Sequence, residues 1–516
     1  MSVGVAAMMP RSGLPLKTAA PPRAVAVVKA ARAVAYNDGP AATAVPVIAL
    51  SRVDSDDASK PGLRALKTRP LERNIALAKL GLGAGTQIVA HSIANVFRGR
   101  VARGAADRRF YAQQAQVLAD ELGRLKGSVM KAGQMLSLYG QYFLPEEAVA
   151  VLSALQDDTP AVDWTLIEPV LRASLGARLA ELEIEERPLA AASLGQVHRA
   201  RRRADGLSLV VKVQYPGVAQ AIDSDIRTLS RLLLLTRLAP KGLDLAPVFA
   251  EVREMLHREV DYRAEARFTE EYARRLADDP RFVVPRVLRE YSNGQVLTTT
   301  YEAGLSPRHE RIAGLSQVRR NRLGEAFVDL FLTEFFDWRI IQSDPHFGNY
   351  RIRIGGGAQD RIVLLDFGAT RRFEPRFVEA YREIVRGAVH DDREQILRGA
   401  QAIGLMQTGF PEPVLKAFAE LCQLIVEPFR LPDDPRVPPG LFNARGEYRY
   451  GVSDLPMRAA GVAARNALSR YFRVPPREIV FLHRRLAGVF IMLATLGAEL
   501  NARSRLLRSL DPAAGR

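Results

Sequence analysis

Two short acidic motifs in the second half of the chain could together hold a divalent cation. Asp344-Pro-His-Phe-Gly-Asn349 carries a carboxylate and an amide five residues apart, and Leu364-Leu-Asp366-Phe-Gly368 adds a second carboxylate after an apolar run. Carboxylate and amide oxygens are hard ligands that suit Mg²⁺. In this order the first Asp can orient or deprotonate an attacking group, while the Asn and second Asp hold Mg²⁺ beside nucleotide phosphates. A surface loop followed by a turn would explain either motif alone, but it does not explain both in succession.

A lysine that could contact the phosphates lies upstream. Leu207 to Gln214 is rich in β-branched residues and ends before Pro216, which predicts a strand. Alternation places Val210, Lys212 and Gln214 on one face of that strand. A lysine in so apolar a strand is costly if it is buried without a partner. It therefore either reaches solvent from an edge strand or binds phosphate, and the acidic motifs favour phosphate binding.

A turn of small residues precedes this strand. Glu181 to Leu189 and Val197 to Arg202 are predicted as two strands around the turn 190–196, whose backbone N–H groups could face phosphates. Alanines keep these amide donors but add Cβ atoms, so we expect a stiffer loop than a glycine-rich one. The loop residues expected to contact a nucleotide are Ala191, Ala192, Ser193 and Gly195.

These motifs resemble the UbiB/AarF family of atypical, protein-kinase-like proteins, which in eukaryotes includes proteins that support coenzyme Q synthesis. The resemblance extends from about residue 123 to residue 368. It implies an α+β, two-lobed protein-kinase-like fold with an N-terminal helical extension. The segments that carry it are Lys131-Ala-Gly-Gln134 (the KxGQ motif), Leu152 to Asp157, the alanine-rich loop Ala190 to His198, Glu259-Val-Asp261-Tyr-Arg-Ala-Glu265 (the ExD segment), and the two acidic motifs.

The resemblance also implies roles for single residues. Lys212 would bind phosphates and pair with Glu265, while Asp344 would orient the nucleophile. Asn349 and Asp366 would bind Mg²⁺. Further expected roles are adenine binding at the linker 298–304 that contains Tyr301, gating by Lys131 and Gln134, and contact of Glu259 and Asp261 with Lys131 or metal.

The KxGQ motif lies in a predicted helix, residues 115–139. Its leucine stripe is expected to be core, and Lys131 and Gln134 share a different face. Spacing alone favours a solvated face, but in the family this helix covers the site where a kinase would seat a peptide. Activity toward large protein substrates is therefore not expected.

Four segments are predicted along the chain: a disordered tail at 1–60, a helical KxGQ extension at 61–165, an N-lobe at 166–304 with a helical insert at 222–248, and a mainly helical C-lobe at 305–510. The tail is rich in Ala, Pro and Val and is a poor core former. The single cysteine, Cys422, excludes a disulfide framework.

The net charge of +16 is spread along the chain without a nucleic-acid-binding signature. We therefore expect an anionic membrane surface, rather than nucleic acid, as a partner. Residues 75–97 are predicted to be a packed or interfacial helix, and 481–500 a C-lobe helix that does not span a membrane. Arg- and Ala-rich usage predicts a bacterial protein, cytoplasmic and peripheral to the inner membrane, in preference to a mitochondrial one.

The function expected from the motifs and the resemblance is that of an Mg²⁺-ATP-binding ATPase or small-molecule kinase that supports ubiquinone biosynthesis. Its partners would be isoprenoid-quinone precursors or the enzymes that process them. The alternative is a nucleotide-regulated scaffold or lipid-binding protein without turnover, and a conventional protein kinase is third.

Overall fold

The computed structural model describes residues 131–133, 135–136, 149, 161–192, 194–235, 245–356, 359–467 and 476–511. The predictions for the tail 1–60, for 75–97, for 152–157, for most of the helix 115–139, and for Gln134 and Ser193 lie outside these residues. Residues 131–133 and 135–136 are helical, in agreement with the predicted KxGQ helix at that point.

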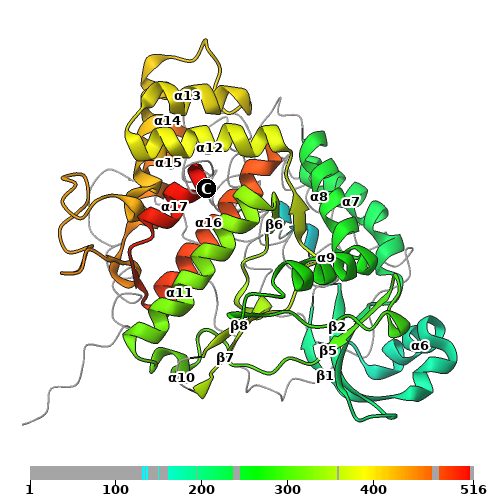
Figure 1. The fold of residues 1–516 in the computed structure, drawn as a ribbon. Helices are drawn as coiled ribbons and strands as arrows, with labels where there is room; N and C mark the ends of the chain where they lie inside the picture. The colour runs from blue at the N-terminus through cyan, green and yellow to red at the C-terminus, as the bar shows by residue number, and fades with distance from the viewer. Residues whose placement is uncertain are drawn as a thin grey trace, which may run out of the picture. The chain divides into compact units, whose positions relative to one another are not determined.

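Helices and strands alternate in the first part of the described chain, and helices dominate the rest (Figure 1). The helices are α6 (Trp164–Leu175), α7 (Val218–Leu235), α8 (Ala246–Glu259), α9 (Tyr262–Arg275), α10 (Glu310–Ala313), α11 (Gln317–Leu332), α12 (Pro375–His390), α13 (Arg393–Ala402), α14 (Glu412–Ile425), α15 (Leu455–Ala467), α16 (Arg477–Leu496) and α17 (Arg503–Leu510). The strands are β1 (Leu182–Ala191), β2 (Gly195–Arg202), β3 (Ser208–Gln214), β4 (Phe282–Val283), β5 (Val296–Thr300), β6 (Ile340–Gln342), β7 (Tyr350–Arg353), β8 (Arg361–Leu364), β9 (Thr370–Arg372), β10 (Tyr448–Arg449) and β11 (Glu499–Leu500).

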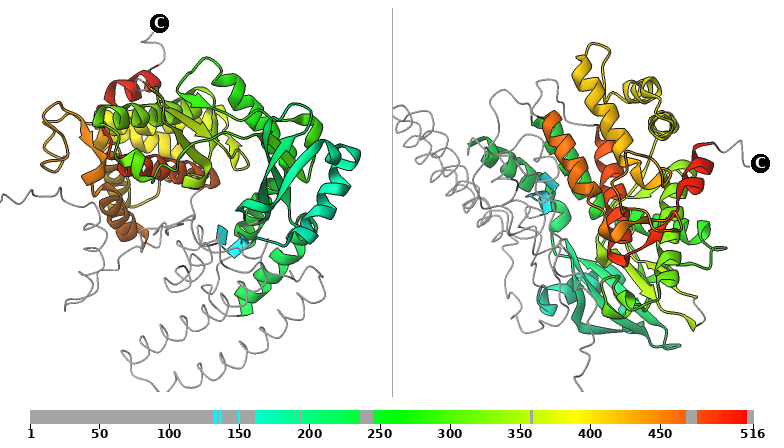
Figure 2. Two further views of the ribbon diagram at one scale, coloured as in Figure 1. Left: turned by 90° about the horizontal axis from the view of Figure 1, so that it is seen from below. Right: turned by 90° about the vertical axis from the view of Figure 1, so that its left-hand side faces the viewer.

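An antiparallel sheet in the order β1-β2-β3-β5 carries Lys212 (Figure 2). Lys212 lies opposite Val197 on β2 and Leu297 on β5. Residues directly opposite in such a sheet share a face. Val211 and Val213 point the other way and are fully buried in the core that includes α6. One face of the sheet is therefore sealed by α6, and the other carries Lys212.

Two local predictions differ from the structure. The turn between the first two strands is shorter than 190–196, because β1 continues to Ala191, β2 begins at Gly195, and the Ala192 N–H donates to the Gly195 carbonyl at 2.8 Å. The predicted single helix in the insert 222–248 is two helices, α7 and α8. Pro247 lies in the first turn of α8, where the backbone N–H that proline lacks would have no partner within the helix.

A buried ion pair anchors the helical part of the chain. Arg485 on α16 is 2% exposed, and its Nε and Nη2 donate to Glu334 Oε2 at 3.1 and 2.9 Å. Tyr272 on α9 donates to the other Glu334 oxygen at 2.9 Å. A buried charge is tolerated only when it is paired and hydrogen-bonded, so these contacts fix α16 against both α9 and the turn after α11.

Among the described helices, α16 is long and apolar enough to cross a membrane by length and composition. Half of its most apolar window is buried within the protein, and it runs beside α11 (Figure 1). A Cβ on Gly488 of α16 would lie 1.9 Å from the Pro345 Cβ, so the helix packs directly on the loop that carries Asp344. These contacts identify α16 as a packed helix of the fold.

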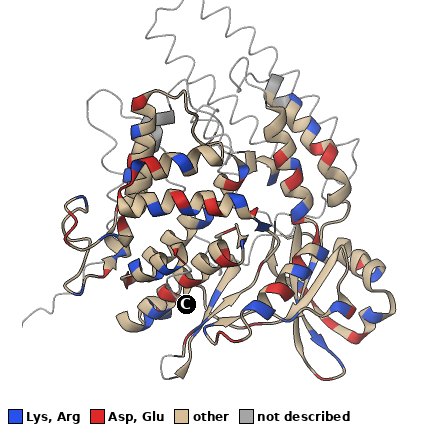
Figure 3. Cartoon of the chain, turned by 45° about the horizontal axis from the view of Figure 1, so that its top comes forward, with Lys and Arg blue, Asp and Glu red and all other residues tan. Residues whose placement is uncertain are grey.

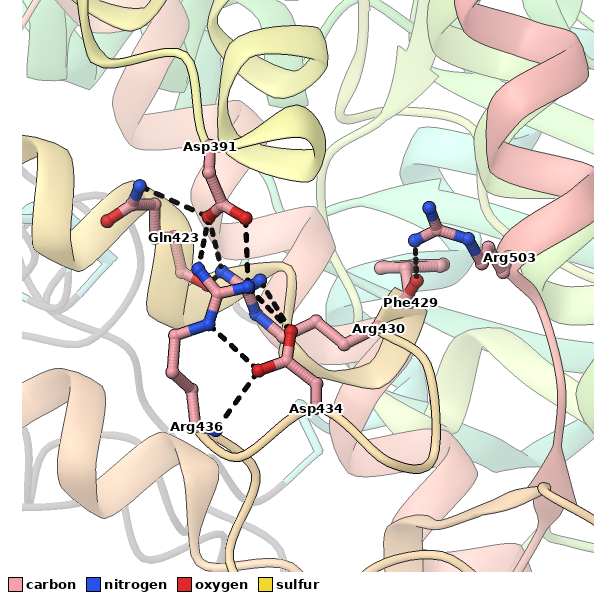
Figure 4. A network of polar contacts seen from close by, with 7 residues as sticks. All are labelled: Asp391, Gln423, Phe429, Arg430, Asp434, Arg436 and Arg503. Atoms are coloured by element: carbon pink, nitrogen blue, oxygen red, sulfur yellow. Dashed lines mark hydrogen bonds and ion pairs between the residues drawn. The ribbon is translucent and has the colours of Figure 1, made fainter.

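Surface charges of both signs are interspersed along the described helices (Figure 3). One group forms a network at the end of α12, where Asp391 has a left-handed backbone with φ of 61° (Figure 4). Arg430 and Arg436 both donate to Asp391 and to Asp434. Networks order a surface more than isolated pairs do, and this one ties the loop after α14 to the α12–α13 turn.

We predict that Gly488→Ala destabilises the protein and that Gly461→Ala does not. Overpacking against Pro345 should lower the free energy of unfolding by about 1–3 kcal/mol. A Cβ at Gly461, inside α15, meets nothing within 4 Å, and alanine there should stabilise the helix by about 0.5–1 kcal/mol. Urea unfolding of both variants measures this, and equal stabilities would contradict the packing of α16 on the Asp344 loop.

Candidate functional site

Three segments far apart in the sequence meet at Lys212. Its Nζ donates to Glu265 Oε1 and Oε2 at 2.7 and 2.9 Å, and to Asp366 Oδ2 at 3.3 Å. Lys212 comes from β3, Glu265 from α9, and Asp366 from the turn after β8. The structure thus brings together the lysine and two of the carboxylates that the sequence singled out.

The start of α9 sets the position of Glu265. The Asp261 carboxylate accepts the Ala264 N–H at 3.0 Å and so caps the helix. Glu265 follows in the first turn, where a carboxylate is favoured by the helix dipole. On its other side, a Cβ on Gly368 would lie 3.2 Å from Glu265 Oε2. The glycine of the second acidic motif therefore leaves room for the Glu265 carboxylate.

Burial and charge act in opposite directions on this group. Burial raises the pKa of Glu265 to about 7, although Lys212 opposes the rise. Burial alone would lower the pKa of Lys212, but Asp366 and Glu265 raise it well above its usual value. Lys212 is therefore held as a cation between the buried Glu265 carboxylate and the half-buried Asp366 carboxylate.

The carboxylate of Asp344 is bound on both oxygens. Arg484 Nη2 on α16 donates to Oδ1 at 2.7 Å, and Asn349 Nδ2 donates to Oδ2 at 3.2 Å. Burial would raise the pKa of Asp344, but the positive charges of Arg484, Lys131 and His346 outweigh it and hold the pKa below its usual value. Asp344 is thus kept ionised.

Sequence reasoning did not assign Arg484 to the site. It lies in an apolar stretch and served only as evidence that this stretch does not span a membrane. An arginine in the most apolar window of a helix needs a partner, which was the available signal, but nothing in the sequence identified Asp344 as that partner.

Lys131 of the KxGQ motif lies close to Asp344. Its Nζ forms an ion pair with Glu259 Oε1 at 3.0 Å, and its charge lowers the pKa of Asp344. Glu259 is the last residue of α8, whereas Asp261 caps α9, so the ExD segment spans the junction of two helices. Asp261 precedes the first turn of α9, so it is a cap of that helix and does not lie within it beside Glu265.

The alanine-rich loop passes over Tyr262. A Cβ on Gly195 would lie 2.7 Å from the Tyr262 hydroxyl and 2.4 Å from the Val213 carbonyl oxygen. Position 195 therefore requires glycine, because a Cβ there would clash with Tyr262 and with the backbone of Val213. Ala191 is exposed and Ala192 is half-buried. In the register of the sheet Ala191 pairs with Gln196, on the face opposite Lys212.

Tyr301 follows β5 in the linker to the helical part of the chain. Its N–H donates to the Ser208 carbonyl at 3.0 Å, and the Arg199 guanidinium lies 4.3 Å from its ring centroid. The linker thus begins beside the outer end of β3, four residues from Lys212.

The donor set fits Mg²⁺ better than a transition metal. Within the described residues, no three His, Cys, Asp or Glu side chains are grouped to hold a metal. Asp366 and Asn349 can each offer one oxygen, and Mg²⁺ is commonly held by one or two carboxylates together with substrate phosphates. A cation here would thus depend on phosphate oxygens for the rest of its ligands.

We predict that Lys212→Met makes stability strongly dependent on pH. Without Lys212 the pKa of Glu265 should rise further above its unfolded value. A raised carboxyl pKa contributes stability that is lost as pH rises from the unfolded pKa through the folded one. The free energy of unfolding should therefore fall between about pH 5 and 8, by about 1.4 kcal/mol per unit of further pKa shift.

Urea unfolding of Lys212→Met and of Lys212→Met/Glu265→Gln measures this effect. The double variant should lose the added pH dependence, because it carries no buried carboxyl at position 265. Identical pH dependence in the two variants would show that removal of Lys212 does not raise the pKa of Glu265.

The comparisons with known proteins agree with this site. Residues 154–400 match the ABC1 atypical kinase-like domain. The chain is 31% identical to atypical kinase COQ8 of Schizosaccharomyces pombe, over 76% of this chain and 62% of that protein. It is 31% identical to rat COQ8B over 82% of this chain and 76% of that protein, and 30% identical to Saccharomyces cerevisiae COQ8 over 85% and 84%.

A solved structure, that of Rv3197 from Mycobacterium tuberculosis in complex with erythromycin, is also similar. It has a TM-score of 0.51 and 25% identity, and the match covers 80% of this chain and 96% of that one. The predicted kinase-like fold is confirmed.

The predicted location is wrong. COQ8 of both yeasts and COQ8B of rat are named as mitochondrial proteins, which overturns the expectation of a bacterial inner-membrane protein. Amino-acid usage rich in Arg and Ala was the basis of that expectation. Such composition reflects the genome more than the compartment in which the protein works. The predicted family, in contrast, is confirmed: the chain belongs to the ABC1 (UbiB/AarF) family of atypical kinase-like proteins, which includes COQ8.

Proposed function

We propose that this chain binds Mg²⁺-ATP and acts as an ATPase or small-molecule kinase that supports ubiquinone biosynthesis at a membrane. The observation that carries the proposal is the contact of Lys212 with both Glu265 and Asp366. A lysine oriented by a helix carboxylate and an Asp-Phe-Gly aspartate is the arrangement by which kinase-like proteins place ATP phosphates.

Each residue of the site has a role in this proposal. Lys212 binds the α- and β-phosphates, and Glu265 orients Lys212. Asp366 and Asn349 hold Mg²⁺, which when bound would neutralise charge on the phosphates. Ala191, Ala192, Ser193 and Gly195 present the loop to the phosphates, and Tyr301 lies in the linker that binds adenine.

Asp344 would orient the attacking hydroxyl or water. Its low pKa makes it a weak base, so orientation contributes more than proton removal. Asn349 and Arg484 fix its carboxylate from two sides, which supports a positioned rather than a mobile carboxylate. Transfer of phosphate mainly requires such positioning and electrostatic stabilisation.

The position of Lys131 argues for a small acceptor. Lys131 is paired with Glu259 and close enough to Asp344 to lower its pKa. A protein substrate would have to bring its hydroxyl to Asp344 past this pair. Lys131, with Gln134, Glu259 and Asp261, is therefore proposed to restrict access to water or a small molecule.

The quinone assignment and the compartment rest on the relatives. The yeast and rat proteins carry COQ8 and mitochondrial in their names, and we extend a mitochondrial, membrane-associated role in coenzyme Q synthesis to this chain. ATP, isoprenoid-quinone precursors and quinone-biosynthesis enzymes are the partners proposed.

The second candidate is a nucleotide-regulated scaffold without turnover. The observation that favours it is the set of cations around Asp344, because a carboxylate held by Arg484 and neighboured by Lys131 has limited freedom to meet an acceptor. The complete set of phosphate and cation ligands favours the enzyme.

We predict that Asp366→Asn abolishes Mg²⁺-dependent ATP turnover and coenzyme Q rescue, whereas Asp278→Asn leaves both unchanged. Asp278 is exposed and distant from the site residues in sequence. Coenzyme Q would be measured in a budding yeast strain that lacks COQ8 and expresses each variant, and ATP turnover would be measured on purified protein. Rescue of coenzyme Q synthesis by Asp366→Asn would contradict the proposed enzymatic role and support a scaffold without turnover.

We also predict that Arg484→Gln shifts the acid limb of the pH–activity profile upward. Arg484 lowers the pKa of Asp344, so its loss should raise that pKa. Turnover of Mg²⁺-ATP would then begin to fall at a higher pH. Arg322→Gln, on the exposed part of α11, is the charge-matched control, and an unshifted acid limb in Arg484→Gln would rule out Asp344 as the titrating group.

A further inference from the structure

Among the residues that the structure describes, three arginines near the linker have no carboxylate partner. Arg199, Arg308 and Arg351, called here the linker arginines, contact only rings and backbone carbonyls within the described part of the chain. By contrast, Arg353, two residues beyond Arg351, pairs with Glu302 at 2.7 Å. Unpaired arginines on folded surfaces are common, but three around one linker call for a ligand that neutralises them.

The linker arginines are held in fixed orientations. The Arg199 guanidinium lies over the Tyr301 ring, and the Arg308 guanidinium lies 4.2 Å from the Phe347 ring centroid. Arg351 Nη1 donates to the Gly348 and Tyr350 carbonyls at 3.1 and 2.8 Å. Guanidinium groups oriented in this way lose little further entropy when they bind an anion.

The strand register places Arg199 on the Lys212 face and turns Arg351 toward the linker. Arg199 is opposite Val210 in the β2–β3 register, two pairs along from Val197 and Lys212, and so shares the Lys212 face. On β7, Tyr350 points into the core, where its hydroxyl accepts a bond from Arg485. Arg351 follows it in the strand and therefore faces the opposite way, toward the linker.

The two loops that carry Arg308 and Arg351 are joined directly. Leu305 and Ile352 exchange backbone hydrogen bonds of 2.9 and 2.8 Å. A Cβ on Gly304 would lie 2.7 Å from the Arg351 Cβ, so the linker passes closely over this arginine.

These charges oppose folding in the absence of a ligand. Burial lowers the pKa of the half-buried Arg351 and, although its side chain is exposed, that of Arg308. The nearby acid, Glu302, is engaged by Arg353 and by the Thr300 hydroxyl. Desolvated like charges are unfavourable unless a counter-charge arrives.

The charge distribution indicates what that counter-charge belongs to. Asp366, Glu265 and Asp344 make the Lys212 end of the site acidic, whereas the linker end is cationic. A neutral base needs no such cations. Phe347, whose ring the Arg308 guanidinium covers, lies in the same loop as Asp344, three residues further along the chain.

We propose that the linker arginines bind an anionic phosphate group on the small acceptor molecule. The proposal rests on the proposed function, because it assigns the acceptor that Asp344 would orient. Planar guanidinium groups match phosphate oxygens in pairs, which gives both affinity and orientation. The phosphate can belong to a soluble ester or to a lipid headgroup.

The test measures binding of glycerol 3-phosphate, as the probe, to the full chain saturated with Mg²⁺-ADP. Arg308→Leu and Arg351→Leu should each weaken probe binding by about tenfold, the typical effect of losing a hydrogen bond to a charged group. Mg²⁺-ADP affinity should change less than about twofold, within the effect of a remote surface substitution. Arg322→Leu is the control and should alter neither.

Thermal unfolding without ligand separates binding from a structural role. If the linker arginines serve a ligand, Arg351→Leu should be at least as stable as the wild type, because a desolvated unpaired cation is removed. Unchanged probe binding in both variants, or a parallel loss of Mg²⁺-ADP binding in Arg351→Leu, would overturn the proposal.

Lys212→Met distinguishes this proposal from the proposed function. Loss of Mg²⁺-ADP binding with probe binding retained in that variant supports two separate subsites. A wild-type chain that binds the probe but no nucleotide would overturn the proposed function and leave the arginine subsite standing.

Binding to phospholipid vesicles identifies the source of the phosphate. Phosphatidylcholine vesicles with and without phosphatidylglycerol are sedimented with each variant. Binding that requires phosphatidylglycerol and is lost in Arg308→Leu supports a headgroup phosphate, while probe binding without vesicle binding supports a soluble ester. Failure of the wild type to bind either probe would overturn the proposal.

Discussion

The contact of Lys212 with Glu265 and Asp366 is the interaction on which the site depends. A cation on a half-buried strand is stable only when carboxylates surround it, and these come from α9 and from the turn after β8. The contact therefore joins the sheet, the helix that packs on it and the second acidic motif. Loss of Lys212 would leave the buried Glu265 carboxylate without its cation, which is more damaging than the loss of one hydrogen bond. Fold and chemistry are thus linked at the same three side chains.

Close backbone approach is the second constraint. Gly195 lies against Tyr262 and the Val213 carbonyl, Gly368 lies against Glu265, and Gly488 lies against Pro345. Each allows an element to come nearer than a Cβ would permit. The phosphate loop, the Asp-Phe-Gly turn and the Asp344 loop are each positioned in this way. The alanine-rich loop keeps one glycine at the one position where the structure leaves no room for a side chain.

Charge is distributed unevenly around the site. Acidic groups gather where a cation and phosphates would bind, and each carboxylate there has a cationic neighbour from another element. Arg484 and Lys131 hold Asp344 ionised from α16 and from the KxGQ motif. The linker arginines have no such counter-charges. An enzyme site can retain such uncompensated charge, because the ligand supplies the missing partner when it binds.

The sequence by itself was enough to predict the family, the kinase-like fold and the pairing of Lys212 with Glu265. The resemblance of the motif strings to the UbiB/AarF family was sufficient, because the KxGQ motif and the alanine-rich loop are specific to that family. The length of the loop 192–194 and the two helices of the insert depended on hydrogen bonds and packing that spacing does not encode. Arg484 could be placed against Asp344 only by the tertiary structure, because 140 residues separate them. Which residue pairs with a buried charge depends on which helices and strands pack together. That packing is determined by the whole core and not by the local sequence.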